Sequence, residues 1–196
     1  MTSALHRRQV VEILLQERKN LLVVAGLGST SWDITAAGDS PLSFPLWGAM
    51  GNAAMIGLGL ALAQPARRVL VITGDGEMLM GLGSLATIGV QRPRNLSVVV
   101  VDNERYGETG MQATHTASGV DLAKVAKACG FRSARQVRKP GQLGSLRAAI
   151  HGAPGPHFAQ VKVVAEKLPL VLPPRDGGIL KSRFRKALLG DGAELD

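Results

Sequence analysis

The sequence contains a single cysteine, few aromatic side chains and no long apolar run. Cys129 alone cannot form an internal disulfide, a four-thiolate iron–sulfur site or a cysteine-based zinc finger. No apolar run reaches the roughly 18 residues that a membrane-spanning helix needs. Arg7, Arg8 and Glu12 interrupt the N-terminal segment where the core of a signal peptide would stand. We therefore expect a cytoplasmic protein that does not enter a membrane.

The scarcity of aromatic residues also shapes the core. Aromatic residues make up 4% of the chain, whereas 45% of the residues are hydrophobic and 19% are charged. A core built from this composition is aliphatic, and the composition argues against a disordered chain, a collagen or a coiled coil. The length of 196 residues fits one domain. With 24 glycines for turns between aliphatic segments, the chain is typical of an α/β fold that binds nucleotide-like ligands.

Acidic residues are in deficit. The chain has 23 Lys and Arg against 15 Asp and Glu, a net charge of +8. The basic residues are scattered except near the end, and no nucleic-acid recognition motif accompanies them. An anionic ligand or an acidic partner accounts for the excess, so we expect no nucleic-acid partner.

Apolar periodicity predicts an alternation of helices and strands. Helical spacing marks residues 4–18, 50–63, 77–90, 121–130 and 142–150, and continuous aliphatic runs mark strands at 21–24, 68–73, 97–101 and 157–164. Residues 25–31 are expected to form a turn-rich loop. The alternation predicts an α/β fold with a doubly wound, mostly parallel sheet and helices on both faces. We assign residues 1–172 to this domain and residues 173–196 to a basic tail or docking segment.

Polar residues follow two of the predicted strands directly. Gly74, Asp75 and Gly76 close the strand at 68–73. Another 26 residues follow before Asn103, which comes after the strand at 97–101. Parallel strands joined by a helix bring their carboxyl ends to one edge, where such sheets bind ligands. A carboxylate and an amide oxygen suit Mg²⁺, and glycines beside a helix N-terminus suit phosphate. The spacing therefore indicates a site for a divalent cation and a diphosphate.

The pattern resembles the thiamine-diphosphate-binding domain of 2-oxoacid decarboxylase-type enzymes, over roughly residues 5–170. That family carries Gly-Asp-Gly, then about 25 to 30 residues, then Asn. Two further stretches, Leu-Gly-Ser-Leu-Ala-Thr-Ile-Gly at 82–89 and Tyr-Gly-Glu-Thr-Gly-Met-Gln-Ala-Thr-His-Thr at 106–116, are most similar to the sulfopyruvate decarboxylase β subunits and then to the phosphonopyruvate decarboxylases. The resemblance implies thiamine diphosphate and Mg²⁺ as cofactors.

The resemblance also implies roles for individual residues. Asp75, Asn103 and the main-chain carbonyl of Arg105 would bind Mg²⁺. The Gly48 carbonyl would accept the aminopyrimidine hydrogen, and Met50 would hold the cofactor in its bent form. The residues expected to contact the diphosphate are Thr30, Ser31, Gly74, Gly76 and Glu77.

The side-chain role of Glu77 is in question, because relatives usually have a small residue there and an acid beside a diphosphate is repulsive. This carboxyl must turn away or cap the helix. Thr109, Gln112 and His115, in the loop after Asn103, could bind the anionic end of the substrate or move a proton. A solvent-exposed histidine in a mobile loop accounts equally well for His115.

The chain lacks the pyrimidine-binding domain whose glutamate activates the cofactor in this family. We therefore expect an α-type partner subunit that supplies this domain, a hetero-oligomer, and apolar interface around Leu46, Trp47 and residues 78–82. The expected reaction is decarboxylation of a small anionic 2-oxoacid, with 3-sulfopyruvate giving sulfoacetaldehyde. Phosphonopyruvate decarboxylation, acetolactate-type carboligation and a non-catalytic cofactor-binding scaffold are the alternatives.

Overall fold

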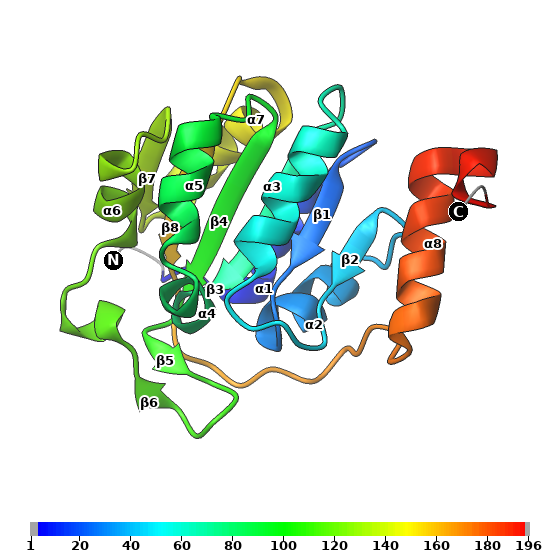
Figure 1. Ribbon diagram of the computed structural model, residues 1–196. Coiled ribbons are helices and arrows are strands. Elements are labelled where there is room, and N and C mark those ends of the chain that lie inside the picture. The colour runs from blue at the N-terminus through cyan, green and yellow to red at the C-terminus, as the bar shows by residue number, and fades with distance from the viewer. Residues whose placement is uncertain (1–3, 195–196) are drawn as a thin grey trace.

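A six-stranded parallel sheet forms the centre of the molecule in the computed structural model, which describes residues 4–194. The strand order is β2-β1-β3-β4-β8-β7. The strands are β1 (Leu22–Ala25), β2 (Ser43–Pro45), β3 (Val69–Gly74), β4 (Leu96–Asp102), β7 (Ser133–Val137) and β8 (His157–Lys162). A separate antiparallel hairpin, β5 (Arg105–Tyr106) and β6 (Gln112–Ala113), lies beyond the carboxyl end of β4 (Figure 1).

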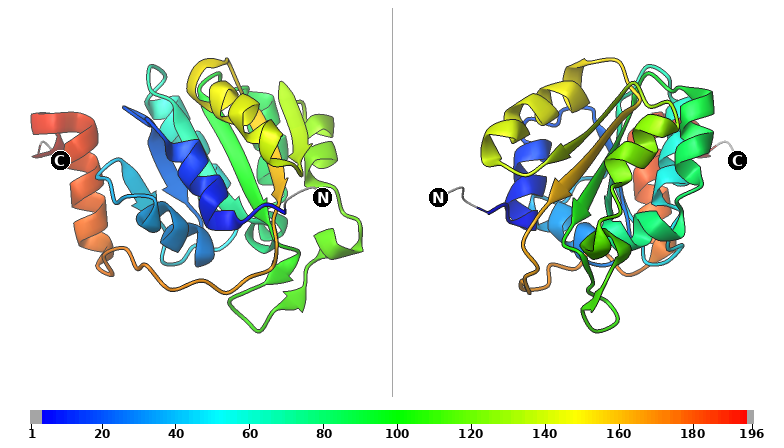
Figure 2. Two further views of the ribbon diagram at one scale, coloured as in Figure 1. Left: turned by 180° about the vertical axis from the view of Figure 1, so that it is seen from behind. Right: turned by 90° about the vertical axis from the view of Figure 1, so that its left-hand side faces the viewer.

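Helices cover both faces of this sheet. The helices are α1 (Arg7–Leu15), α2 (Ser29–Ala36), α3 (Ala53–Ala63), α4 (Asp75–Met80), α5 (Ser84–Gln91), α6 (Leu122–Ala128), α7 (Leu143–Gly152) and α8 (Gly177–Leu189). Figure 1 shows α3, α5 and α6 in front of the sheet, and Figure 2 shows α1 and α7 behind it. Short 3₁₀ turns follow at η1 (His115–Ser118), η2 (Pro140–Gln142) and η3 (Gly190–Glu194). The predicted doubly wound α/β fold is confirmed.

The central strands are apolar on both sides because both sides are buried. In β3, Val69 and Val71 pack into the core under α3 and α5, whereas Leu70 and Ile72 pack into the core under α1 and α7. Successive side chains of a strand point to opposite faces, so a strand between two helical layers has no polar face. This explains the continuous aliphatic runs in the sequence.

Most predicted elements are confirmed, with boundaries that differ by a few residues. The predicted helix at 121–130 is α6, with Asp121 at its N-cap accepting a hydrogen bond of 2.9 Å from the Lys124 N–H. The loop expected at 25–31 was wrong in its second half, because α2 begins at Ser29. Strands β2 and β7 and the β5–β6 hairpin were not predicted. Strand β2 has only three residues and ends at Pro45, and β7 is a half-buried edge strand.

The single helix expected at 77–90 is two helices. Helix α4 begins at Asp75, directly after β3, and α5 begins at Ser84. The break has a packing cause, because a Cβ atom on Gly81 would lie 1.9 Å from the carbonyl oxygen of Gly51. The backbone of the 48–52 loop thus passes directly against the end of α4.

The last part of the chain crosses the carboxyl edge of the sheet. Residues 163–176 run from β8 to α8, which packs beside β2 at the opposite edge (Figure 1). The Phe44 and Phe184 rings lie 5.4 Å apart, and Arg183 forms an ion pair of 2.5 Å with Asp39. Residues 1–3 and 195–196, the ends of the two predicted parts, lie outside the described residues. Within residues 4–194, no helix is long and apolar enough to cross a membrane.

Candidate active site

A cavity of about 250 Å³ opens at the carboxyl ends of β1, β3 and β4. Nine of the residues predicted for the site line it: Thr30, Met50, Gly74, Asp75, Gly76, Glu77, Asn103, Arg105 and Thr109. Ser31, Gly48, Gln112 and His115 are not among its lining residues. The structure therefore brings the two strand-end groups, Asp75 and Asn103, to one shared cavity.

Asp75 is the first residue of α4 and is buried. Its Oδ2 accepts hydrogen bonds from the hydroxyl groups of Thr114 at 2.5 Å and Thr116 at 3.2 Å. Burial raises the pKa of the Asp75 carboxyl to about 6, the Thr114 bond opposes this rise, and the nearby charge of Asp102 adds to it. An isolated carboxylate in this position is destabilised, and a bound cation would relieve that cost.

Asn103 and Arg105 leave β4 together. The Asn103 side-chain oxygen accepts the Arg105 N–H at 2.9 Å, which turns the chain into the β5–β6 hairpin. This oxygen keeps a second lone pair for a metal ion. Both residues line the cavity, as the predicted ligand set requires.

The charged residues that line the cavity are Arg7, Asp33, Asp75, Glu77, Arg105 and Glu108. Arg7 pairs with Asp33, and the Glu77 carboxylate accepts the Thr73 hydroxyl, so Asp75 is the buried acid whose charge a metal ion would offset. Within the described residues, no group of three or more His, Cys, Asp or Glu could hold a metal. A metal here would be held by one carboxylate, an amide and backbone oxygens, the hard donor set that suits Mg²⁺.

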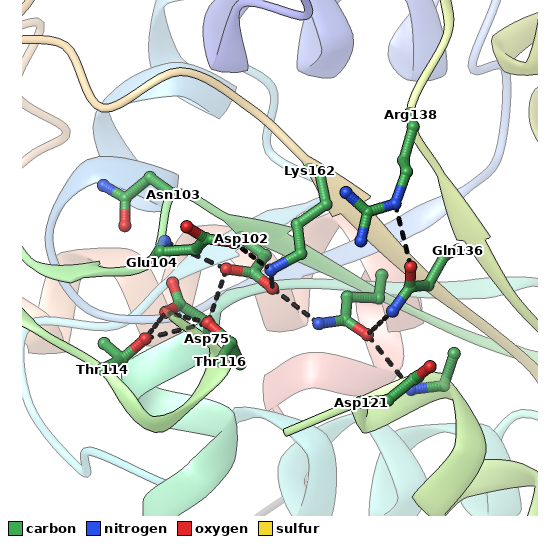
Figure 3. A network of polar contacts seen from close by, with 12 residues as sticks. Asp75, Asp102, Asn103, Glu104, Thr114, Thr116, Asp121, Gln136, Arg138 and Lys162 are labelled. Carbon is green, nitrogen blue, oxygen red and sulfur yellow. Dashed lines mark hydrogen bonds and ion pairs between the residues drawn. The ribbon is translucent and has the colours of Figure 1, made fainter. Parts of the chain in front are cut away.

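A buried polar network continues from Asp75 into the sheet (Figure 3). The single hydroxyl hydrogen of Thr116 is shared between Asp75 and Oδ1 of Asp102, which is the nearer acceptor at 2.8 Å. Oδ2 of Asp102 accepts from Gln160 at 2.6 Å and pairs with Lys162 at 2.8 Å. Burial alone lowers the pKa of Lys162, but the bonds and charges of Asp102 and Glu104 outweigh it and raise that pKa. The network fixes the end of β4 and the 114–116 segment in one arrangement.

The Glu77 carboxyl turns toward the protein interior. Its Oε2 accepts the Thr73 hydroxyl at 2.7 Å, and a Cβ on Gly26 would lie 1.7 Å from the same oxygen. Burial raises the pKa of this carboxyl, while the Thr73 hydrogen bond opposes the rise, as do N–H groups including that of Gly51. Glu77 thus joins the end of β3 to the loop after β1, and its main chain stays at the cavity.

The residues predicted to contact the diphosphate differ in the hydrogen-bond donors that they have free for a ligand. Thr30 and Ser31 each donate a hydroxyl hydrogen to the Gly26 carbonyl, at 2.9 and 2.7 Å. Their hydroxyl hydrogens are therefore already engaged, which leaves the N–H groups at the start of α2. A Cβ on Gly76 would lie 2.5 Å from a ring carbon of Tyr106, so this glycine also makes room for that ring.

Of the three loop residues predicted to bind the substrate, Thr109, Gln112 and His115, the structure places one at the cavity. Thr109 lines the cavity and donates to the Gln112 side-chain oxygen at 2.9 Å. Gln112 and His115 are exposed. Gly48 is exposed as well, whereas Met50 lines the cavity with 38% of its surface exposed.

Arg7, Asp33, Tyr106 and Glu108 line the cavity but were not predicted as site residues. Arg7 carried a usable signal, because it precedes Val10, Val11 and Leu14 at the spacing of the buried face of α1. A charged residue on such a face needs a partner or a function. Asp33 lies on α2, and no helix was predicted there because residues 25–31 were expected to form a loop. Without a predicted helix, the sequence did not show that Asp33 faces the core.

Comparison with known proteins identifies the family. The profile of the family described as "Thiamine pyrophosphate enzyme, C-terminal TPP binding domain" matches residues 29–161. The chain belongs to the thiamine pyrophosphate enzymes. It is 38% identical to the sulfopyruvate decarboxylase subunit beta of Methanothermobacter thermautotrophicus, over 95% of this chain and 97% of that protein.

Other relatives of this thiamine pyrophosphate enzyme are longer. The phosphonopyruvate decarboxylase of Streptomyces viridochromogenes is 39% identical over 80% of this chain but only 39% of its own length. A solved structure of a putative thiamin diphosphate-dependent enzyme from Mycobacterium smegmatis superposes with a TM-score of 0.70 and 23% identity. It covers 84% of this chain and 33% of that one, which supports the fold.

Proposed function

We propose that this chain is the β-type subunit of a thiamine diphosphate- and Mg²⁺-dependent 2-oxoacid decarboxylase that converts 3-sulfopyruvate to sulfoacetaldehyde and carbon dioxide. The observation that carries the proposal is the 38% identity to a sulfopyruvate decarboxylase subunit beta over nearly the whole of both chains. The placement of Asp75 and Asn103 on one cavity supports it.

The proposal assigns the metal to the strand-end groups. Asp75, Asn103 and the Arg105 carbonyl would hold Mg²⁺, whose charge would offset that of the buried Asp75 carboxylate. The main chain of Gly74, Gly76 and Glu77, with the start of α2 at Thr30 and Ser31, would bind the diphosphate. Gly48 and Met50 would contact the aminopyrimidine.

When bound, the thiazolium ring supplies the electron sink that decarboxylation of a 2-oxoacid requires. Thr109 then lies at the cavity, where its hydroxyl could orient the substrate. Gln112 is bonded to Thr109, and its side chain donates back to the Thr109 carbonyl at 3.0 Å. His115 is exposed and does not line the cavity, so the loop would have to bring it to the cavity for it to move a proton.

A separate α-type subunit with the pyrimidine-binding domain and the activating glutamate completes the proposed enzyme. The interface expected around Trp47 and residues 78–82 is partly supported, because Trp47 and Met80 are 41% and 60% exposed. Leu46 and Met78 are buried in this chain and belong to its own core. The division at residue 172 and the cytoplasmic location stay predictions.

Phosphonopyruvate is the second candidate substrate. It is favoured by 39% identity to a phosphonopyruvate decarboxylase over 80% of this chain. The two substrates share a 2-oxoacid and differ in the acidic group, so one assay distinguishes them.

The test is to purify the chain with the polypeptide that accompanies it from its source and to assay the complex with Mg²⁺ and thiamine diphosphate. We expect sulfoacetaldehyde from 3-sulfopyruvate, less turnover of phosphonopyruvate, no turnover by the isolated chain, and none by an Asp75→Ala complex. Robust turnover by the isolated chain would contradict the subunit arrangement. Cofactor binding without turnover of any 2-oxoacid would instead indicate a scaffold.

A further inference from the structure

Thr114 is a buried side chain beside Asp75, and the proposed function gives it no role. It lies between the exposed residues Ala113 and His115, yet only 1% of its own surface is exposed. Its hydroxyl group donates to Oδ2 of Asp75 at 2.5 Å. A hydroxyl group that is buried against a carboxylate restrains the direction of that carboxylate, because the hydrogen bond is lost when the carboxylate turns.

The threonine hydroxyl groups contact only one of the two carboxylate oxygens of Asp75. Thr116 is 4% exposed and its hydroxyl oxygen lies 3.2 Å from the same Oδ2 and 2.9 Å from that of Thr114. Among the described residues, no side chain donates to Oδ1 of Asp75. The arrangement therefore holds Oδ2 within the protein and leaves Oδ1 for a cation in the cavity that Asp75 lines.

Contacts with the sheet hold Thr114 in place (Figure 3). The Thr116 hydroxyl lies 2.8 Å from Oδ1 of Asp102, and Lys162 pairs with Oδ2 of Asp102 at 2.8 Å. Lys162 also pairs with the Glu104 carboxylate at 2.7 Å, and the Glu104 carbonyl accepts the Thr114 N–H at 3.1 Å. These contacts connect the ends of β4 and β8 to the 114–116 segment, which gives Thr114 the rigid support that a partner of a metal ligand needs.

Thr114 also attaches the β5–β6 hairpin to the body of the protein. Residues 107–110 and 112–113 of the hairpin are exposed, and its two strands share only two residue pairs. A hairpin with so few buried contacts opens easily unless its ends are held. Thr114 directly follows β6, so its bond to Asp75 holds one end of the hairpin that carries Thr109 and Gln112.

We infer that Thr114 is a positioning residue for the proposed metal ligand Asp75, and that it links metal binding to the ordering of the β5–β6 hairpin. The inference rests on the proposed function for the identity of the metal site. Coupling between two binding or ordering events is reciprocal. A contact that supports metal binding therefore also lets the bound metal stabilise the hairpin.

The experiment compares Thr114→Val and Thr114→Ser in the full chain with its partner. Val keeps the shape of Thr without the hydroxyl group, whereas Ser keeps the hydroxyl group. Thr35→Val is the matched control, because the Thr35 hydroxyl donates to the Ser31 carbonyl at 2.8 Å and Thr35 does not line the cavity. Calorimetric titration measures Mg²⁺ binding without and with inorganic pyrophosphate, and hydrogen exchange measures the protection of the amides of residues 104–114.

Thr114→Val is expected to weaken Mg²⁺ binding by about 10- to 100-fold, whereas Thr114→Ser and Thr35→Val stay within about threefold of the wild type. Turnover of 3-sulfopyruvate by the Thr114→Val complex should recover at high Mg²⁺ concentration, because the variant loses the orientation of a ligand and no reacting group. In the wild type, Mg²⁺ with pyrophosphate should slow the hydrogen exchange of the hairpin amides, and Thr114→Val should lose this protection.

Mg²⁺ binding of wild-type strength by Thr114→Val, or equal weakening by Thr114→Val and Thr114→Ser, would overturn the inference. Circular dichroism and thermal denaturation check the fold of each variant. If Thr114→Val does not fold, hydrogen exchange of the wild type decides, and hairpin amides that Mg²⁺ with pyrophosphate does not protect would overturn the inference. Failure of the proposed function has a different signature, because the wild-type complex would then bind Mg²⁺ and pyrophosphate, and lose Mg²⁺ affinity in Thr114→Val, without turning over a 2-oxoacid.

Discussion

At the scale of single residues, the buried Asp75 carboxyl gives the site a characteristic pH response. Its pKa rises from the usual 3.8 to about 6 in the folded protein, chiefly through burial. The folded state therefore holds this proton more tightly than the unfolded state. The contribution of Asp75 to the stability of the metal-free protein therefore falls as pH rises from about 4 to 6 and is lost above that window.

Asp75→Asn tests this response. A shift of about two pKa units corresponds to roughly 3 kcal/mol, so the metal-free variant should be more stable than the wild type by up to that amount at pH 7.5. At pH 4 the difference should nearly vanish, because the wild-type carboxyl is then protonated. Urea denaturation measures the difference in stability between the wild type and the variant at each pH. An equal difference at pH 7.5 and pH 4 would contradict the raised pKa of Asp75.

The same variant separates stability from ligand binding. Mg²⁺ should raise the melting temperature of the wild type at pH 7.5, raise it less at pH 5, and leave Asp75→Asn unchanged, because a metal ligand must be deprotonated. Asp33 and Glu77, whose pKa values are also raised by burial, are present in both proteins. The comparison therefore isolates Asp75.

At the scale of helices and strands, the break between α4 and α5 depends on one close approach of two backbones. Gly51 has φ of +87°, and its carbonyl occupies the space that a Gly81 side chain would need. We expect Gly81→Ala to lower the free energy of unfolding by about 1 to 3 kcal/mol, since either α4 or the 48–52 loop must shift. It should also weaken thiamine diphosphate binding, because Met50 and Met80, the residues directly before Gly51 and Gly81, both line the cavity.

Gly83→Ala is the matched control for this prediction. Nothing lies within 4 Å of a Cβ at Gly83, which already has helical backbone angles at the start of α5. Its stability should be unchanged or slightly higher. Urea denaturation and calorimetric titration compare the two variants, and an equal loss in both would mean that glycine flexibility, rather than the Gly51 contact, governs the break.

The same break illustrates what could and could not be predicted from the sequence. Buried strands such as β3 and β4 were predictable because helices on both faces require continuous apolar runs. The approach of Asp75 and Asn103 to one cavity was predictable because parallel strands bring their carboxyl ends to one edge of the sheet. The contact of Gly81 with Gly51 joins residues 30 positions apart and leaves no local pattern. The same holds for the inward turn of Glu77 toward Gly26.

At the scale of the whole molecule, the C-terminal segment covers two edges of the sheet. Residues 163–176 pass along the ligand-binding edge, held by contacts such as that of the Trp47 indole N–H with the Pro174 carbonyl at 2.8 Å. Helix α8 then covers β2 at the far edge, where Phe184 is 8% exposed and packs on Phe44. An exposed edge strand favours association with other chains, so this cover also protects the sheet.

Phe184→Ala tests how much the cover contributes. Removing this buried ring should lower the free energy of unfolding by about 3 kcal/mol, through lost burial and the cavity left behind. Ile179→Ala on the same helix is the control, because Ile179 is 57% exposed, and it should change stability by less than about 0.5 kcal/mol. Since α8 does not line the cavity, affinity for thiamine diphosphate should stay within about twofold in both variants below their unfolding transitions. A weaker Kd in folded Phe184→Ala protein, measured by calorimetric titration, would show that the edge strand and the ligand site are coupled through β1, which pairs with β2 and ends at the cavity.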